Sequence, residues 1–201
     1  MQSLTADEPI IVLDFETSGM SPDQGDRAIE VGAVQVRNGR IAERFQSLIN
    51  PGFLISREIE LVTGINNRML STAPPAAQVM EELAAFLGSS PLVAHNASFD
   101  EKFLQAEFAL LGRKRPYSFG CTLLLAKRIY PEAPNHKLET LIRYHKLAST
   151  GEFHRALADA EMTAGLWLQI VADLKQRYGF SALPFAVLKK LSRVPYQEVD
   201  A

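Results

Sequence analysis

A hydrophobic segment near the N-terminal end of the chain has the pattern of a buried β-strand. Residues Ile10–Thr17 are apolar and mostly β-branched or aliphatic, apart from two acids. Four further segments have strand-like patterns, and Asn38-Gly39 joins the first two of them, a pair typical of tight hairpin turns because both positions tolerate positive φ. These segments are residues 28–37, 40–49, 92–95 and 117–121.

Segments with helical periodicity lie between and after these predicted strands. Ser56 is expected to cap the first of them, and Ser98 with Glu101 fits a capping box at the start of the third. The helical segments run from Ser56 to Gly64, from Pro75 to Gly88, over residues 99–111, from Cys121 to Tyr130, over residues 138–144 and over residues 155–178. This order predicts an α/β fold, with three antiparallel strands and then shorter parallel strands in a mixed sheet that helices cover on both faces.

The predicted elements form one domain and a short C-terminal tail. Residues 1–178 contain all the strands and the long helices, and we expect them to form the domain. The tail, residues 179–201, has an apolar repeat between two prolines, made up of Phe185, Leu188 and Leu191. This repeat predicts a short amphipathic helix that packs back on the same domain, and the alternative is a contact with a polymerase subunit or a second copy of the chain.

The composition is that of an ordinary globular domain. With 201 residues, 47% hydrophobic and 22% charged, the chain is long enough for one well-filled core. A formal net charge of −2 argues against a protein that coats long nucleic acid by charge alone. The single cysteine excludes an intramolecular disulfide. No apolar segment approaches the roughly 20 residues of a membrane span, so we expect a cytoplasmic protein with no membrane partner.

The two acids of the first strand are the most informative chemical feature. Because side chains alternate along a strand, Asp14 and Glu16 project from the same face, about 7 Å apart. Two like charges on an apolar element are unfavourable unless a cation or water compensates them. Carboxylate oxygens are hard ligands that suit Mg²⁺ or Mn²⁺. The pair therefore indicates a metal site, or else a frayed strand end where water hydrates both acids.

A third acid lies on the apolar stripe of the last long helix. Asp159 shares this stripe with Met162, Thr163, Leu166 and Ile170. An unpaired carboxylate there would be unfavourable, which indicates a metal ligand or a bond to a backbone amide at the edge of the stripe. His154 lies five residues earlier, at a junction where histidines are often structural or solvated. If Asp159 is a ligand, the imidazole overhangs the same metal.

The fourth acid lies where a short strand is followed by a helix. The segment is His95-Asn96-Ala97-Ser98-Phe99-Asp100, and sites in α/β sheets often lie at such junctions. An acid in the first helical turn is also stabilised by the helix dipole. Because Glu101 already fits the capping role, Asp100 is expected to face elsewhere.

Three motifs together resemble those of the DnaQ-like 3′–5′ exonucleases of the DEDDh class. They are Asp14-Phe15-Glu16-Thr17, the segment from His95 to Asp100, and His154-x4-Asp159. The resemblance extends from Ile10 to about Leu174 and includes Leu61-Val62-Thr63-Gly64-Ile65, which is similar to the family's Leu-Thr-Gly-Ile segment. This family includes the proofreading epsilon subunit of bacterial DNA polymerase III, ribonuclease T and oligoribonuclease, and it implies a ribonuclease H-like fold. The first motif looks closest to the polymerase-associated branch.

The resemblance implies catalysis with two divalent cations, Mg²⁺ or Mn²⁺. Asp14, Glu16 and Asp159 would hold the first ion, Asp14 would also bridge to the second, and Asp100 would support the second. His154 would be the general base for the water that attacks the terminal phosphodiester. The products would be a nucleoside 5′-monophosphate and a new 3′ hydroxyl.

The resemblance also implies the substrate contacts. Thr17, Leu61 and Ile65 match family positions near the terminal nucleotide, and Asn96 is a candidate for the sugar or phosphate. Core or loop packing remains the alternative for Leu61 and Ile65, as does a helix-start role for Asn96. The expected substrates are single-stranded 3′ ends, with DNA ahead of RNA. The alternatives are an RNA-trimming exoribonuclease and a non-catalytic nucleic-acid or polymerase-binding module, and the presence of all five motif residues favours the enzyme.

Overall fold

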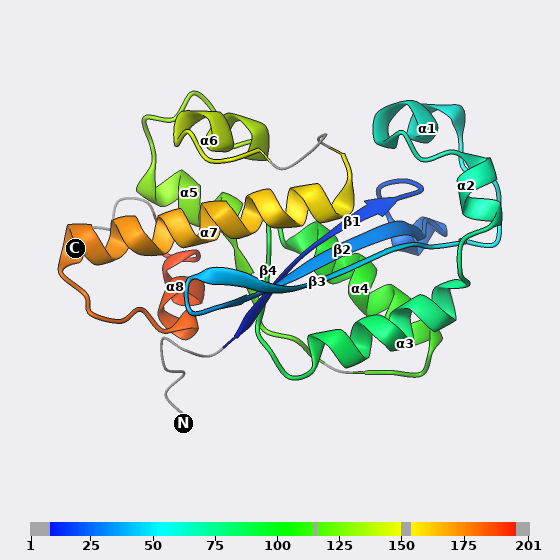
Figure 1. The fold of residues 1–201 in the computed structure, drawn as a ribbon, viewed down its shortest axis with the longest axis horizontal. Coiled ribbons are helices and arrows are strands. Elements are labelled where there is room, and N and C mark those ends of the chain that lie inside the picture. The colour runs from blue at the N-terminus through cyan, green and yellow to red at the C-terminus, as the bar shows by residue number, and fades with distance from the viewer. Residues whose placement is uncertain (1–8, 115, 150–153, 196–201) are drawn as a thin grey trace.

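The computed structural model describes residues 9–114, 116–149 and 154–195, which form a mixed β-sheet between layers of helices (Figure 1). The strands are β1 Ile10–Thr17, β2 Ala28–Arg37, β3 Arg40–Leu48, β4 Leu92–Ala94 and β5 Phe119–Cys121. The order in the sheet is β3-β2-β1-β4-β5. The first three strands pair antiparallel, whereas β4 pairs parallel with β1 and with β5. This arrangement confirms the predicted α/β fold with a mixed sheet.

The helices follow the predicted segments closely. They are η1 Pro22–Gln24, α1 Arg57–Thr63, α2 Asn67–Ser71, α3 Ala76–Leu87, α4 Ser98–Leu110, α5 Thr122–Ile129, α6 Leu138–Tyr144, α7 Ala156–Tyr178 and α8 Phe185–Leu191. The sequence did not indicate η1 or α2, because each is too short to have an apolar repeat. Within the described part of the chain, no helix combines the length and the hydrophobicity that crossing a membrane requires.

The structure confirms some of the predicted turns and helix caps and contradicts one. The hairpin turn is confirmed, since Asn38 and Gly39 have φ values of 52° and 72°. Ser56 caps α1 as predicted, because its side chain accepts a hydrogen bond from the backbone of Ile59. The predicted capping box of α4 is wrong: the helix begins at Ser98 itself, and the N-cap position is occupied by Ala97, which makes no capping bond. The residue before it already has helical backbone angles, so Ser98 lies one position too late to act as a cap.

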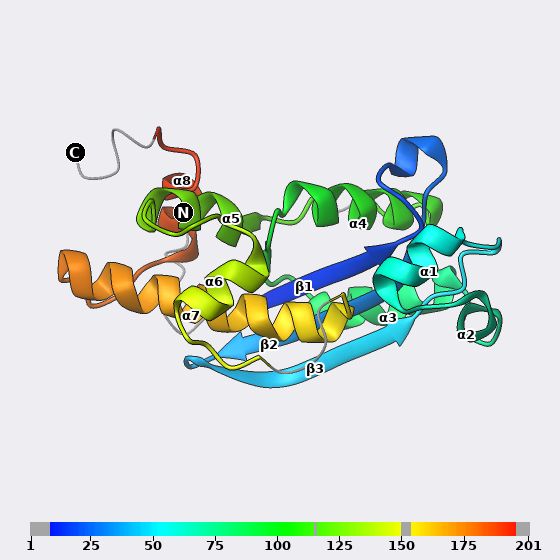
Figure 2. The same ribbon diagram turned by 90° about the horizontal axis from the view of Figure 1, so that it is seen from above.

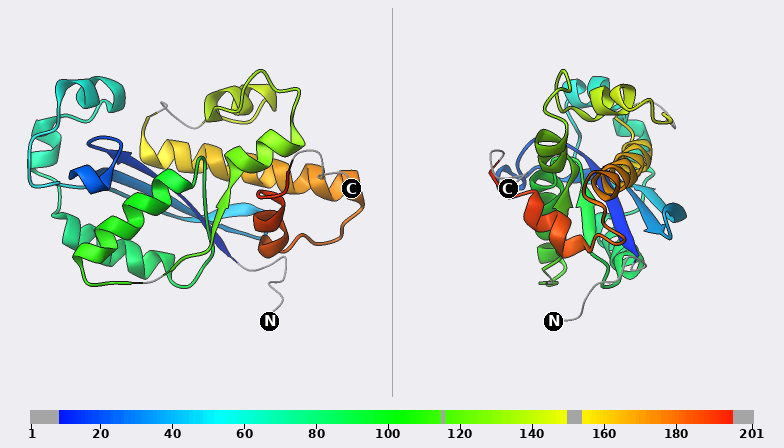
Figure 3. Two further views of the ribbon diagram at one scale, coloured as in Figure 1. Left: turned by 180° about the vertical axis from the view of Figure 1, so that it is seen from behind. Right: turned by 90° about the vertical axis from the view of Figure 1, so that its left-hand side faces the viewer.

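Alternation along β1 divides its side chains between two hydrophobic cores. Ile10 and Val12 pack in a core with residues of α5, α6, α7 and α8. Ile11, Leu13 and Phe15 pack in a second core with residues of α3 and α4. As a result α7 covers one face of the sheet, and α3 and α4 cover the other (Figure 2 and Figure 3). Both faces of β1 are therefore buried over most of its length.

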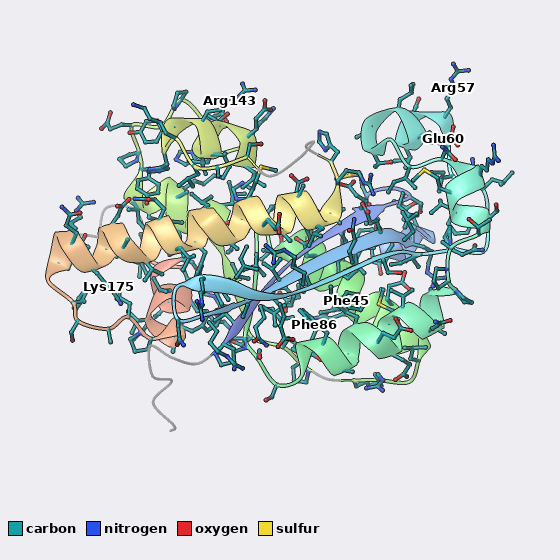
Figure 4. All side chains as sticks on the ribbon, viewed as in Figure 1. Phe45, Arg57, Glu60, Phe86, Arg143 and Lys175 are labelled. Carbon is teal, nitrogen blue, oxygen red and sulfur yellow. The ribbon has the colours of Figure 1, made fainter. Side chains whose placement is uncertain are left out.

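The edge strand β3 is linked to both helical layers. The Phe45 ring lies 5.6 Å from the Phe86 ring of α3, centroid to centroid, and Figure 4 shows the two rings beside each other. On the other side, the Arg44 Nε donates to the Glu161 carboxylate of α7 at 2.6 Å. These contacts fix the outer strand between α3 and α7.

The C-terminal helix α8 packs on the same core as α7. Phe185 and Leu188 are buried, and the Phe185 ring lies 5.9 Å from the Trp167 ring of α7. The Lys189 Nζ also donates to the Ser118 hydroxyl, just before β5. The apolar face of α8 is therefore occupied within the chain.

The first turn of α7 lies directly on β2. A Cβ atom placed on Gly32 would lie 2.1 Å from the Leu157 nitrogen and 2.2 Å from the Ala156 carbonyl carbon. Gly32 pairs with Asp14 across the β1–β2 ladder. The helix can begin beside the acids of β1 only because the facing residue of β2 has no side chain.

Substitution of this glycine should separate the helix from the sheet. We expect Gly32→Ala to lower the free energy of unfolding by about 1–3 kcal/mol or more, because the new methyl group overlaps backbone atoms that cannot rotate away. Gly165→Ala, in α7 itself, has open space around the new methyl group and should raise stability by roughly 0.5–1 kcal/mol. Urea denaturation measures both. Equal stability of the two variants would contradict the close packing.

Candidate active site

The acids of β1 lie on the face that α7 covers. Ile10 and Val12 belong to that face, so the alternation of the strand places Asp14 and Glu16 there as well. Both side chains are half-buried at the C-terminal end of β1. They lie opposite Gly32 and Glu30 of β2. The end of β1 and the N-terminal end of α7 lie close together (Figure 1).

Asp100 joins these acids from α4. Parallel pairing between β1 and β4 is limited to the first half of β1, so β4 provides no partner for the Phe15 backbone N–H. Asp100 takes that place: its Oδ1 accepts from the Phe15 nitrogen at 3.2 Å. The side chain is only 2% exposed. Because Phe15 separates Asp14 from Glu16, this bond holds a third carboxylate beside the pair.

The start of α7 contributes an acid and an imidazole. Asp159 is buried, and its Oδ2 accepts from the His154 backbone N–H at 3.0 Å. His154 is exposed, and its backbone is left-handed with φ of 67°. Single ligand atoms of Glu16, His154 and Asp159 all lie within 4.8 Å of one another. The structure thus brings together the residues that the second and third motifs contribute with those of the first.

Burial, together with repulsion from neighbouring acids, raises the pKa of every carboxylate in this group. Burial is the largest cause for Asp14, whose pKa lies well above its usual range, and repulsion from Asp100, Asp159 and Glu16 adds to it. Burial, with repulsion from Asp159, raises the pKa of Glu16 to about 8. Burial also raises the pKa of Asp100 to about 8, against the opposing bond from Phe15. The pKa of Asp159 is raised by burial too.

These residues fit divalent cations. The Oδ1 atom of Asp159 is buried and has no hydrogen-bond partner among the described residues, so it is available to a ligand. The neighbouring donors are carboxylate oxygens and one imidazole nitrogen, a set that suits Mg²⁺ or Mn²⁺. A cation would also remove the repulsion that raises the carboxylate pKa values. The site therefore has both the donors and the electrostatic need for metal ions.

Two candidate substrate contacts lie beside this group. The Thr17 hydroxyl, at the end of β1, donates to the Gly19 carbonyl at 2.6 Å, so it also shapes the loop after the strand. Asn96 is exposed and has a φ of 69°. Its carbonyl accepts from the Phe99 nitrogen at the start of α4. Asn96 thus takes part in the helix start through its backbone.

The two apolar candidates have opposite environments. Leu61 of α1 is 75% exposed. Ile65 is fully buried in a small cluster with Ile29, Ile55 and Leu70. The prediction that Ile65 contacts a nucleotide directly is therefore wrong. Ile65 packs in the core beneath the segment that carries the exposed Leu61. The sequence could not separate the two residues, because both are aliphatic and lie in the same short motif.

His95 of the second motif has a structural environment. Its Nδ1 lies 2.9 Å from the Thr122 hydroxyl and its Nε2 lies 2.9 Å from the His136 carbonyl. Burial lowers the pKa of His95 to about 4, so the ring is neutral near pH 7. A carbonyl can only accept, so Nε2 carries the proton and Nδ1 accepts from Thr122. The imidazole thus links the end of β4 to α5 and to the segment before α6.

Two charged residues beside the site were missed by the sequence analysis. Glu30 of β2 is fully buried, and its carboxylate accepts both guanidinium bonds of Arg155. A charged residue inside the apolar run of β2 was a signal for such a partner, because buried carboxylates need compensation. The sequence alone did not indicate which cation would provide it.

The sequence of this chain is similar to a known family and to known proteins. A family model described as an exonuclease matches residues 11–167. The chain is 37% identical over 188 residues to the 3′-5′ exonuclease DinG of Bacillus subtilis strain 168, an alignment that covers 92% of this chain and 19% of DinG. It is 38% identical over 174 residues to the PolC-type DNA polymerase III of Halalkalibacterium halodurans, covering 85% and 12%. The chain thus spans less than a fifth of the length of these relatives.

Solved structures have the same fold. Exonuclease X in complex with 5′ overhanging duplex DNA is 26% identical, with a TM-score of 0.71 over 91% of this chain and 99% of that one. The nuclease domain of 3′hExo, a DEDDh family member bound to rAMP, is 20% identical, with a TM-score of 0.70 over 83% and 93%. The similarity extends over nearly the whole of both solved chains.

The raised carboxylate pKa values predict an unusual dependence of stability on pH. Without metal, native Glu16 keeps a proton that the unfolded chain has lost between about pH 4.5 and 8, so stability falls as pH rises through this interval. Glu16→Gln lacks this titration. We therefore expect the variant to become progressively more stable than the wild type between about pH 4.5 and 8, and the difference to level off above that. Urea denaturation in chelator measures this difference.

The comparison with the variant is needed because His95 acts in the opposite direction. Its lowered pKa makes stability rise with pH between about 4 and 6.5 in both proteins. Added Mg²⁺ should reverse the difference at pH 8, because the ion binds the native wild type more tightly than the variant. A difference that does not change with pH would contradict the electrostatic description of the site.

Proposed function

The chain belongs to the exonuclease family, whose model matches residues 11–167. From this premise we propose that it is a two-metal-ion 3′–5′ exonuclease of the DnaQ-like DEDDh class, acting on single-stranded nucleic-acid ends. The observation that carries the proposal is the meeting of the four carboxylates with His154 at the ends of β1 and α7. The polarity is supported by 37% identity to a relative named as a 3′-5′ exonuclease. The reaction would release nucleoside 5′-monophosphates one at a time.

The four acids divide between two ion sites in this proposal. Asp14, Glu16 and Asp159 would hold one Mg²⁺ or Mn²⁺ ion, and Asp14 with Asp100 would hold the other. When bound, the ions would make the attacking water more acidic and neutralise charge on the departing 3′ oxygen. The carboxylates contribute orientation, because their own contacts with β1, α4 and α7 restrict them. The Phe15 bond to Asp100 is one such restraint.

His154 would act as the general base. A neutral imidazole has one nitrogen that can accept a proton, so His154 can take the proton of the attacking water and pass it to solvent. Its exposure leaves a path for that proton. The bond from its backbone N–H to Asp159 keeps the side chain next to the acids. No covalent enzyme intermediate is needed, so no nucleophilic Ser or Cys is required.

DNA is the proposed substrate ahead of RNA. The relatives at 37–38% identity are DinG and a PolC-type DNA polymerase III, and a structure 26% identical was solved with DNA. The neighbour bound to rAMP is only 20% identical, so it bears on the fold alone. Exposed Leu61 would pack on the terminal base, which an aliphatic side chain can do without selecting its identity. An association with a DNA polymerase subunit would have to use surfaces other than the buried face of α8.

The alternative is a binding module that has the fold but no activity. Such a module has no need for four neighbouring carboxylates whose pKa values burial and repulsion raise. That arrangement is unfavourable in the absence of cations, so it favours the enzyme. Activity assays distinguish the two functions directly.

One test of this function concerns metal dependence and polarity. A single-stranded DNA oligomer labelled at its 5′ end should be shortened stepwise in Mg²⁺ or Mn²⁺, with the label kept on the long product. Chelator should abolish hydrolysis, because the acids then repel one another and the phosphate. Asp14→Asn should abolish turnover while leaving the metal-free protein at least as stable. Gel analysis of DNA and RNA oligomers of the same sequence measures activity and preference together.

Two outcomes would contradict this function. Undiminished hydrolysis in excess chelator would exclude the metal-dependent mechanism. Early release of the 5′ label as a mononucleotide would show that the enzyme degrades from the 5′ end instead. A faster reaction on RNA would move the substrate to the exoribonuclease alternative while keeping the chemistry.

Another test separates a base from a metal ligand at His154. His154→Ala should lower kcat by roughly 10²–10⁴-fold, the usual contribution of general-base catalysis. Higher pH should partly restore the rate, because hydroxide in solution then takes over the proton transfer. Mn²⁺ affinity, measured by calorimetry, should change little if the carboxylates hold the ions. His145→Ala is the control: this half-buried ring packs 4.2 Å from the Tyr130 ring, and its loss should leave kcat unchanged.

A variant with wild-type kcat would exclude His154 as the base. A variant whose only defect is weaker Mn²⁺ binding would make it a ligand instead, an alternative that its distance from Glu16 and Asp159 allows.

A further inference from the structure

Glu30 has the most complete set of hydrogen bonds of the acids around the site. It lies in β2 opposite Glu16 and is 0% exposed. Its Oε1 accepts from Arg155 Nη2 at 2.9 Å and from Gln46 Nε2 at 3.0 Å. Its Oε2 accepts from Arg155 Nε at 3.2 Å and from the Ala156 backbone nitrogen at 3.1 Å. Both oxygens are thus occupied by protein donors.

These bonds act on the first residues of α7. Arg155 immediately follows His154, and it precedes the first helical residue, Ala156. No side chain within α7 caps this helix start. Glu30 performs that task from β2, since it accepts the Ala156 N–H and places a negative charge at the positive end of the helix. A strand residue thereby fixes the position at which α7 begins.

Gly32 adds a second constraint on the same turn. It lies two residues after Glu30 on the same face of β2, and α7 backbone atoms occupy the space where its side chain would be. The bond from the Ala156 N–H to Glu30 holds the helix start close to the strand, and the contact with the Gly32 backbone sets how close it can come. Together they determine both the height of α7 above the sheet and its rotation. His154 lies just before this fixed turn, and Asp159 lies within it.

Stability alone does not account for the pair. Replacing a buried ion pair by apolar residues is often neutral or stabilising, because both charges lose their hydration. A bidentate guanidinium–carboxylate contact instead restricts direction strongly. Its contribution here is geometric.

We propose that Glu30 and Arg155 are positioning residues that hold His154 and Asp159 in their reactive arrangement on β1. This rests on the proposed exonuclease function, in which His154 accepts the proton and Asp159 holds an ion. Neither Glu30 nor Arg155 touches the substrate in this role. Their effect passes through the backbone at the start of α7.

Conservative variants test the proposal without removing the whole contact. Arg155→Lys keeps the charge but cannot make the bidentate contact, and Glu30→Gln keeps the shape but removes the charge. Each should lower kcat by roughly 10–100-fold, the usual effect of losing a residue that orients a site, with KM unchanged. The matched control is Arg44→Gln, which breaks the exposed Arg44–Glu161 link between β3 and the same helix. The control should keep the wild-type kcat.

A double-mutant cycle with His154→Ala distinguishes positioning from general damage. If the pair acts largely through His154, Glu30→Gln should reduce kcat by a clearly smaller factor when His154 is already alanine. An equal or larger factor on that background overturns the proposed action through His154, and a wild-type kcat in both Glu30→Gln and Arg155→Lys overturns the proposal as a whole. If Glu30→Gln does not fold, Arg155→Lys provides the same comparison.

Hydrogen exchange provides a readout that does not depend on activity. The His154 amide bonds to Asp159, so its exchange should become faster in Arg155→Lys and remain unchanged in Arg44→Gln. Unchanged exchange in Arg155→Lys overturns the positioning role even if the enzyme is active. Conversely, a wild-type chain that hydrolyses no oligomer disproves the proposed function, while faster exchange would still support the structural coupling.

Discussion

Repulsion between carboxylates at the end of β1 is the constraint around which this structure is arranged. Burial raises the pKa values of Asp14, Glu16, Asp100 and Asp159, and repulsion from neighbouring acids raises them further. Such a group can exist only where the rest of the fold holds it in place. The two hydrophobic cores on either side of β1 provide that stability. The acidic group is thus maintained by apolar packing, and cations would relieve its remaining repulsion.

The helices and strands, and the faces on which their acids lie, could be predicted from local sequence patterns. Strand alternation placed Asp14 and Glu16 on one side of β1, and helical spacing placed Asp159 on the buried side of α7. Those two rules depend only on backbone geometry, which is the same in every protein. The hairpin at Asn38-Gly39 followed from the φ angles that its residues tolerate. The predicted bounds of β1 and β2 were correct, whereas β3, β4 and β5 are one or two residues shorter than the segments predicted for them.

What the sequence could not indicate depends on contacts between distant segments. The Arg155–Glu30 pair joins residues 125 positions apart, and neither residue type indicates its partner. Ile65 packs in a small cluster with Ile29, Ile55 and Leu70, whereas Leu61 lies on the exposed side of α1. Ser98 failed as a cap because the preceding residue had already turned into the helix. In each case contacts with the rest of the fold determined which of the locally possible structures formed.

Asp159 links the proposed base to the proposed metal site. Its Oδ2 accepts the His154 N–H, and its buried Oδ1 has no partner among the described residues. The left-handed backbone of His154 is uncommon for a residue with a side chain, and this bond holds it there. An ion on Oδ1 would restrict the carboxylate further, and through Oδ2 it would restrict the imidazole. In the proposed mechanism, metal binding and alignment of the base are therefore coupled through the two oxygens of one side chain.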